Sequence, residues 1–178
     1  IILVGASGDV GRSAYRELSG RHQILCAGRA GGDFRVDIGD LAAIEAMYDE
    51  AGPFDALICT AGSVHFAPLE EQTAATLTHG LENKLMGQVN LVLAGMSRIS
   101  RGGSFTLTSG VLDRDPVVAG TGAAMANGAL AGFVTSAAIE ARYGAMFPGH
   151  ERGSSEKAGR AFAKCVEGAM TGQVVIVA

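Results

Sequence analysis

Three glycines recur at every third position near the start of the chain, in the segment Gly5-Ala6-Ser7-Gly8-Asp9-Val10-Gly11. An apolar run typical of a buried strand precedes them, and a helix is predicted from about Asp9 to Ser19. At such a turn Gly5 permits the tight bend, Gly8 lets a pyrophosphate approach the backbone, and Gly11 lets helix and strand pack closely. Free amides at the start of the helix then face an anion. The segment predicts a dinucleotide-binding turn; the alternative is a glycine turn that binds nothing.

The end of the second predicted strand indicates which dinucleotide would bind. Sites for NAD usually place a carboxylate there, facing the ribose 2′-hydroxyl. This chain has Arg29 at that point and Arg12 directly after the third glycine. Two guanidinium groups favour the 2′-phosphate of NADP(H) through charge-assisted hydrogen bonds. Asp33 could instead serve the ribose of NAD, but Gly31 and Gly32 place it in a loop beyond the strand. We therefore expect NADP(H) rather than NAD; the alternative for both arginines is ordinary solvated surface.

These segments depend on strands and helices, and the apolar patterns predict the two in alternation. The strands are predicted at Ile1–Val4, Gln23–Ala27, Phe34–Val36, Asp55–Thr60, Ser104–Thr108 and Val174–Val177. After the first helix, others are predicted at Leu41–Ala51 with Asp40 as N-cap, within Leu69–Arg101 (most strongly at Asn83–Ser100), at Gly122–Arg142 and at Ser155–Gly168. This order predicts a single α/β domain over residues 1–178, a doubly wound parallel sheet of the Rossmann type with helices on both faces.

Composition excludes several classes of protein. Of the 178 residues, 48% are hydrophobic and 18% charged, so a core is easily filled and overall disorder is not expected. A net charge of −4 without a basic tract argues against a nucleic-acid partner. No apolar run reaches the roughly 18 residues of a spanning helix, so no membrane partner is expected. Three widely separated cysteines, Cys26, Cys59 and Cys165, form neither a disulfide framework nor a metal cluster, which favours a reducing cytoplasm.

Four further segments match the motifs of one enzyme family. They are Val36-Asp37-Ile38, Cys59-Thr60-Ala61-Gly62, Gly103-Ser104-Phe105-Thr106-Leu107-Thr108-Ser109 and Thr171-Gly172-Gln173-Val174. Together with the glycine turn, they resemble the short-chain dehydrogenase/reductase family over nearly the whole chain. The resemblance implies that the side chain of Asp37 and the amide of Ile38 hold the adenine ring. It also implies that Thr60, Ala61 and Gly62 lie beside the adenosine ribose, and that the fifth strand ends in a catalytic serine, Ser109.

The chain departs from that family at the catalytic residues. The family works with Asn, Ser, Tyr and Lys: Tyr donates the proton, Lys lowers its pKa, and Ser orients the carbonyl. When this chain is aligned with the family pattern at Gly132-Phe133, the family's Tyr-x-x-x-Lys pair falls on Ala123 and Asn127. The family's helical Asn falls on Lys84. Only Ser109 is retained. An alanine cannot donate a proton, and Asn127 could bind ribose hydroxyls but carries no charge.

Another residue would have to replace the missing acid. The three tyrosines, Tyr15, Tyr48 and Tyr143, lie away from the expected site. His65 follows the fourth strand at the catalytic edge of the sheet and could act as the acid, since histidine titrates near neutral pH; it could equally be a solvated loop residue. Lys84 could be an acid or a substrate anchor, or a solvated helix lysine.

The family pattern also has a sixth strand and a substrate loop that this chain does not show. Arg142-Tyr143-Gly144 passes almost directly to Phe147-Pro148. Because parallel sheets rarely leave a gap between strands, we expect that about 20 residues near 143–150 are missing from this sequence but present in the protein, and an acid could lie among them.

Two functions remain open at this stage. The first is an NADP(H)-dependent oxidoreductase that acts on a carbonyl or alcohol of a small-molecule substrate, using Ser109 with water, Lys84 or His65. The second is a catalytically inactive NADP(H)-binding sensor or scaffold. The retained Ser109 favours the enzyme. The small residues of the helix at 122–142 suit the family's subunit contacts, so a homodimer or homotetramer is expected.

Overall fold

Five parallel strands form the sheet of the computed structural model, which describes residues 1–140 and 155–168. They are β1 (Ile2–Val4), β2 (Leu25–Gly28), β3 (Phe34–Arg35), β4 (Phe54–Cys59) and β5 (Ile99–Leu107), in the spatial order β3-β2-β1-β4-β5. The order reverses beside β1, which is the point where doubly wound sheets bind their ligands. Val4 pairs with Ala27 on one side and with Cys59 on the other, so three strands end at one edge. The predicted fold class is confirmed.

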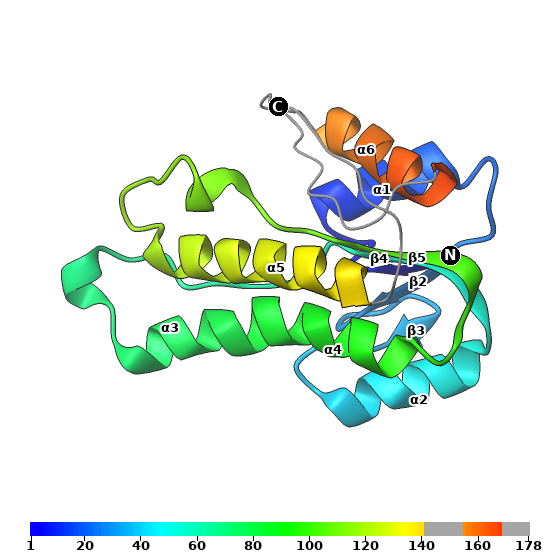
Figure 1. Ribbon diagram of the computed structural model, residues 1–178, viewed down its shortest axis with the longest axis horizontal. Helices are drawn as coiled ribbons and strands as arrows, with labels where there is room; N and C mark the ends of the chain where they lie inside the picture. Colours follow the sequence, from blue (N-terminus) through cyan, green and yellow to red (C-terminus); the bar gives the residue numbers. More distant parts are fainter. Residues whose placement is uncertain (141–154, 169–178) are drawn as a thin grey trace.

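Helices cover both faces of the sheet (Figure 1). On one face α1 (Asp9–Leu18) packs against α6 (Ser155–Glu167). On the other face α2 (Leu41–Ala51) packs against α4 (Gly87–Gly95), and α5 (Thr121–Glu140) packs against α3 (Ala74–Gly80) and the segment after it. Within the described ranges, the helices are too short or too polar to span a lipid bilayer.

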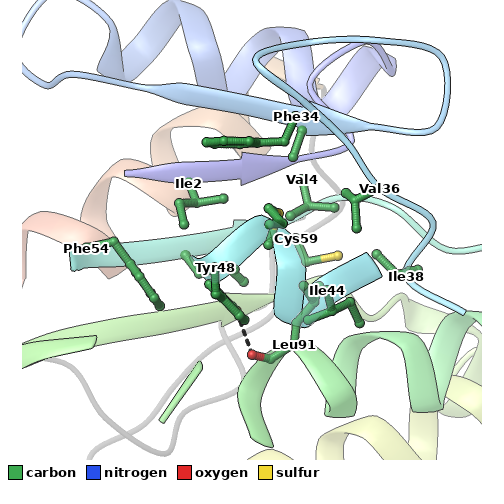
Figure 2. Close-up of a cluster of buried hydrophobic side chains, with 13 residues drawn as sticks. Ile2, Val4, Phe34, Val36, Ile38, Ile44, Tyr48, Phe54, Cys59 and Leu91 are labelled. Atoms are coloured by element: carbon green, nitrogen blue, oxygen red, sulfur yellow. Dashed lines mark hydrogen bonds between the residues drawn. The ribbon is translucent and has the colours of Figure 1, made fainter. Parts of the chain in front are cut away.

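The core has two parts because successive strand residues point to opposite faces. Leu3 of β1 packs with Ala14 and Leu18 of α1 and with Phe162 of α6. The neighbouring residues of β1 join the larger part, which is shown in Figure 2. There the ring of Tyr48 stacks on the ring of Phe54. The Tyr48 hydroxyl donates to the carbonyl oxygen of Leu91 at 2.6 Å, which joins α2 to α4.

The predicted elements agree with the structure at most positions. Asp40 caps α2 as predicted, because its carboxylate accepts from the amides of Ala42 at 2.9 Å and Ala43 at 3.3 Å. The helix predicted at Asn83–Ser100 instead ends at Gly95, and β5 begins at Ile99 rather than Ser104. The predicted strand at Val174–Val177, the end of the helix at 122–142 and the gap near 143–150 lie outside the described residues.

Two glycines explain why the first half of β5 was not predicted. Gly102 has a φ of 83°, which breaks the regular strand, and the register with β4 shifts between Phe54 and Ala56. A side chain at Gly103 would stand 2.5 Å from the carbonyl oxygen of Asp55, so only glycine lets the strands stay paired there. Among the described residues β5 forms one edge of the sheet.

Candidate active site

The glycine turn joins the end of β1 to the start of α1. Gly5 has a φ of 87°, its amide donates to the carbonyl oxygen of Ala27 at 2.8 Å, and its own carbonyl accepts from the amide of Gly8 at 3.1 Å. A Cβ on Gly11 would lie 2.1 Å from that same carbonyl oxygen, so the helix contacts the turn directly. A Cβ on Gly8 would meet no atom closer than 3.5 Å. The space beside exposed Gly8 is therefore open to a ligand at the first amides of α1.

The end of β4 is tied to this turn by Thr60. Its amide donates to the carbonyl oxygen of Val4 at 2.8 Å, and its hydroxyl lies 3.1 Å from that oxygen and 3.0 Å from the carbonyl oxygen of Gly5. Ala61 and Gly62 follow, and Gly62 has a φ of 143° that disfavours any side chain. The residues expected beside the adenosine ribose thus border the glycine turn.

Two basic side chains, Arg29 and Arg35, lie at the end of β2, and a third, Arg12, lies at the glycine turn. Arg12 donates to the carbonyl oxygen of Ser7 and to the carboxylate of Asp9, so it folds over the glycine turn. Arg29 is exposed, and its carbonyl oxygen accepts from the guanidinium of Arg35 at 3.2 Å. Arg35, the last residue of β3, was missed in the sequence; its ladder position opposite Gly28 is the feature that brings it there.

The acidic residues of this region have internal partners. The carboxylate of Asp33 accepts from the amide of Cys26 at 2.7 Å, so it closes the loop after β2. Asp37 accepts from the amide of Gly39 at 2.9 Å and remains exposed. The side chain of Ile38 is buried, and a Cβ on Gly87 would lie 2.7 Å from it. Asp37 and the backbone of Ile38 therefore sit on a segment that is anchored to α4.

Three predicted catalytic residues meet at the same edge of the sheet. The ammonium of Lys84 donates to Asn127 Oδ1 at 2.6 Å, and the hydroxyl of Ser109 donates to the backbone carbonyl oxygen of Asn127 at 3.1 Å. Asn127 is only 1% exposed. The chain passes close over its amide at Gly110, where a Cβ would lie 2.9 Å from Asn127 Nδ2. An ammonium, a hydroxyl and an amide from three different elements thus form one cluster.

A buried glutamine holds this cluster in place. Gln88 is fully buried, and its Nε2 donates to the carbonyl oxygens of Lys84 at 3.1 Å and Thr108 at 3.0 Å. Its Oε1 accepts from the amide of Thr108 at 2.8 Å. The hydroxyl of Thr108 in turn donates to the carbonyl oxygen of Cys59 at 2.6 Å, which joins β5 to β4. Both Gln88 and Thr108 were missed as site residues; a glutamine within an apolar helix was the available signal.

Lys84 lies in a widened helical turn. Residues Leu81–Met86 form the π-helical segment η2 between α3 and α4, a type of turn that often occurs at functional sites. Its neighbour Asn83 accepts through Oδ1 from the amide of Ser63 at 2.8 Å and from the Ser63 hydroxyl at 3.0 Å. The loop after β4 is therefore bound to the turn that presents Lys84.

Burial changes the acidity of the groups at this edge. Burial lowers the pKa of the Lys84 ammonium, and the carboxylate of Asp113 opposes part of that change. Burial raises the pKa of Cys59 to about 12, so this thiol stays protonated and unreactive. Burial likewise raises the pKa of Tyr48, whose hydroxyl is already bound in the core.

The remaining candidates lie apart from the cluster. His65 is exposed and makes no hydrogen bond with Ser109, Lys84 or Asn127 in the described structure. His79 lies 3.2 Å from the hydroxyl of Ser63 on the exposed side of α3. Tyr15 is exposed on α1, and Tyr143 lies outside the described residues. Within residues 1–140 and 155–168, no group of three His, Cys, Asp or Glu side chains could hold a metal ion.

Solved structures resemble this chain along almost its entire length. The protein lin1944 from Listeria innocua is 38% identical, with a TM-score of 0.93 over 99% of this chain and 98% of that one. The chain belongs to the same family as lin1944. No protein-family model and no curated protein matches the sequence.

More distant structures identify the fold. A small-chain dehydrogenase is 24% identical, and a small-chain dehydrogenase in complex with NADPH is 21% identical. Both have a TM-score of 0.87 over 99% of this chain and 94% of theirs. A short-chain dehydrogenase/reductase from Serratia marcescens, 18% identical, has a TM-score of 0.82. This relative of lin1944 therefore has the fold of the short-chain dehydrogenases.

The link from Thr60 to the glycine turn gives a test of the site's architecture. Thr60→Val keeps the shape of the side chain and removes the hydroxyl that binds the carbonyl oxygens at the end of β1 and at the start of the glycine turn. We expect the free energy of unfolding to fall by about 1 kcal/mol, measured by urea denaturation. Thr60→Ser, which keeps the hydroxyl, should lose less than half of that. Equal losses in the two variants would show that the hydrogen bond contributes nothing.

Proposed function

We propose that the protein is an oxidoreductase that uses NADP(H) to interconvert a carbonyl and an alcohol in a small-molecule substrate. The observation that carries the proposal is the cluster in which Ser109 and Lys84 both bind Asn127. This cluster lies at the edge of the sheet that also carries the glycine turn, because Thr60 binds the turn and nearby Gly62 packs on the stem of Lys84. A dehydrogenase of the same fold in complex with NADPH supports the class of cofactor.

The residues at the glycine turn fit a dinucleotide. Gly8 leaves open space next to the start of α1, where an added side chain would stand. The pyrophosphate would be held by the backbone of the turn, including Ser7, Asp9 and Val10, and the adenosine by Asp37, Ile38, Thr60, Ala61 and Gly62. When bound, the dinucleotide would supply or accept a hydride.

The charges near the end of β2 support NADP(H) over NAD. Arg12 and Arg29 would bind the 2′-phosphate, and Arg35 adds a third guanidinium that contacts the backbone of Arg29. The competing reading, in which Asp33 serves the ribose of NAD, loses support because that carboxylate already accepts from the amide of Cys26. Arg29 and Arg35 at the ends of β2 and β3 therefore favour the phosphorylated ribose, and Arg12 would exchange its contact with Asp9 for the phosphate.

The site retains the serine of the family pattern and requires a different acid. Ser109 is half-buried beside Asn127 and would bind the oxygen of the substrate carbonyl. Ala123, at the position of the family's tyrosine, is 2% exposed, so a phenol there would overpack its surroundings. The proton must therefore come from a group other than the residue at position 123.

The same cluster favours an enzyme over a sensor or scaffold. Holding a half-buried ammonium on Asn127 costs desolvation free energy, and dinucleotide binding at the glycine turn does not require it. The cluster has an evident use only if a substrate oxygen is bound there. We therefore favour turnover.

Exposed apolar side chains on α4 and α5 support an oligomer. Leu93 is 57% exposed and Met96, just after α4, 55% exposed, while Met125 on the neighbouring helix α5 is 42% exposed. Small residues beside Met125 would let a second copy approach closely. We propose that the protein is a homodimer or homotetramer through these two helices.

Cofactor preference can be measured directly. NADPH should bind at least ten-fold more tightly than NADH, a difference of about 1.4 kcal/mol, in calorimetric titrations of the purified protein. Arg29→Ala should weaken NADPH binding and leave NADH binding unchanged. Arg101→Ala, at an exposed position near the start of β5, is the control and should change neither. Equal affinities for the two dinucleotides would contradict the preference.

Activity can be detected by following NADPH oxidation spectrophotometrically with panels of aldehydes, ketones and quinones. We expect at least one class to be reduced, and Ser109→Ala to lower kcat/KM at least ten-fold because a hydrogen bond to the reacting oxygen is lost. Ser104→Ala, at the half-buried middle of β5, is the matched control. Turnover that Ser109→Ala leaves unchanged would contradict the assigned role of this serine.

Assembly has its own test by light scattering. The wild type should have the mass of a dimer or tetramer, and Leu93→Glu should shift it to a monomer because a charge is then buried in the contact. Leu69→Glu places the same charge at an apolar side chain that is 68% exposed and belongs to the short 3-10 turn Leu69–Glu71 rather than to α4 or α5, so it should leave the mass unchanged. A monomeric wild type would exclude the oligomer.

A further inference from the structure

We infer that Lys84 is the proton donor of the proposed reaction, held in position by Asn127 and by the widened turn of η2. The inference rests on the proposed oxidoreductase function and names the acid that position 123 cannot supply. Lys84 is a catalytic residue in this account because its ammonium would touch the reacting oxygen. Asn127 is a positioning residue.

The geometry around Asn127 distinguishes Lys84 from the other candidates. An ammonium has three N–H donors, and one of them binds Asn127 Oδ1 at 2.6 Å. The hydroxyl of Ser109 has a single hydrogen, which it donates to the carbonyl oxygen of the same residue, so it would turn from that oxygen to bind a substrate. Lys84 is the titratable group of this cluster, and its other two N–H groups could bind a substrate oxygen while the first stays on Asn127. His65 is exposed, and no hydrogen bond joins it to this cluster in the described structure.

The surrounding backbone holds the lysine firmly. A Cβ on Gly62 would lie 2.8 Å from Lys84 Cγ, so the absence of a side chain lets the lysine stem pack against the chain leaving β4. The carbonyl oxygen of Lys84 accepts from buried Gln88 at 3.1 Å. The neighbouring Asn83 binds Ser63. Contacts on both sides therefore fix the direction in which the ammonium is presented.

The electrostatic surroundings make the Lys84 ammonium a stronger acid than an ordinary lysine. Burial lowers the pKa of Lys84, which makes its proton easier to transfer. Among the described residues the charged group that acts on it is Asp113, which follows β5 and pairs with Arg114 at 3.7 Å. Asp113 favours the charged ammonium, so it sets how far the pKa can fall.

The step balances with these groups. In reduction, the carbonyl carbon accepts a hydride from the reduced nicotinamide while the carbonyl oxygen takes a proton from Lys84 Nζ. The carbon–oxygen double bond becomes a single bond, the product is an alcohol, and the neutral amine of Lys84 then takes a proton from water. Oxidation of the alcohol runs through the same groups in reverse.

The acidity of Lys84 can be measured without turnover. The chain has three lysines, Lys84, Lys157 and Lys164. In protein labelled with lysine 13Cε, NMR titration should give three signals, one of which titrates at lower pH than the others. Lys84→Met should remove that signal, and Lys164→Met should remove a different one. Asp113→Asn should move the Lys84 signal to still lower pH. A Lys84 signal that titrates with the other two would overturn the assignment.

Turnover separates proton donation from charge. Lys84→Arg keeps a positive charge but cannot release a proton, so both it and Lys84→Met should lower kcat for carbonyl reduction by about 10²–10⁴-fold. NADPH affinity, measured by fluorescence, should change by less than about three-fold, because neither substitution removes a contact that holds the dinucleotide. In the wild type, kcat should fall as pH rises through the pKa of Lys84, and the variants should lose this dependence.

The outcomes distinguish the inference from the proposed function. Activity in Lys84→Arg within three-fold of wild type, or a pH dependence that survives in Lys84→Met, would overturn the role of Lys84 alone. Wild-type protein that binds NADPH and reduces no carbonyl would overturn the proposed function, and the role of Lys84 with it. If Lys84→Met fails to fold, as judged by circular dichroism, Lys84→Arg and the wild-type titration still decide the question.

Discussion

The site depends on the hydrogen bonds made by the side chain of Gln88. This side chain is fully buried, and each of its polar atoms has a backbone partner: the carbonyl of Lys84 on one side, and both the amide and the carbonyl of Thr108 on the other. A buried amide left without partners would cost about 1–3 kcal/mol, so this arrangement tolerates little movement of α4 relative to β5. The lysine and the serine are consequently held at a fixed separation. An apolar residue at position 88 would fill the same space and leave the end of β5 free to shift.

This constraint extends to the nucleotide end of the sheet. The hydroxyl of Thr108 binds the carbonyl of Cys59. Thr60, which follows Cys59, binds the glycine turn through its own hydroxyl, and Gly62 packs on the stem of Lys84. The cluster around Asn127 and the open space beside Gly8 are thus connected by hydrogen bonds from two threonine hydroxyls to backbone carbonyls and by the packing of Gly62 on Lys84. A ligand that spans the edge from the turn to the cluster would meet prearranged groups at both ends.

Local sequence features predicted the parts of the fold that are formed locally. The apolar runs identified the strands, Asp40 identified the start of α2, and the spacing of Gly5, Gly8 and Gly11 identified the turn. The first half of β5 was not predicted because Gly102 and Gly103 resemble a loop until their partner strand is known. The widened turn of η2 gave no signal, since its residues are ordinary helix formers.

The candidate site could be predicted only in part because its contacts join distant residues. Lys84 and Asn127 are 43 positions apart, and Gln88 and Thr108 are 20 apart, so neither contact has a local pattern. The family resemblance placed Lys84, Ser109 and Asn127 in the same region, but it did not show that they bind each other. Arg35 was missed because its position near the end of β2 depends on the pairing of β2 with β3.

The central claim is that the glycine turn and the Lys84 cluster form one site. Hydrogen–deuterium exchange of the protein with and without NADPH, followed by mass spectrometry, tests it most directly. NADPH should slow exchange at residues 5–12 together with residues 60–63, 84–88 and 108–110, and leave α6 unchanged. Protection confined to other segments, or none at the glycine turn at saturating NADPH, would contradict it.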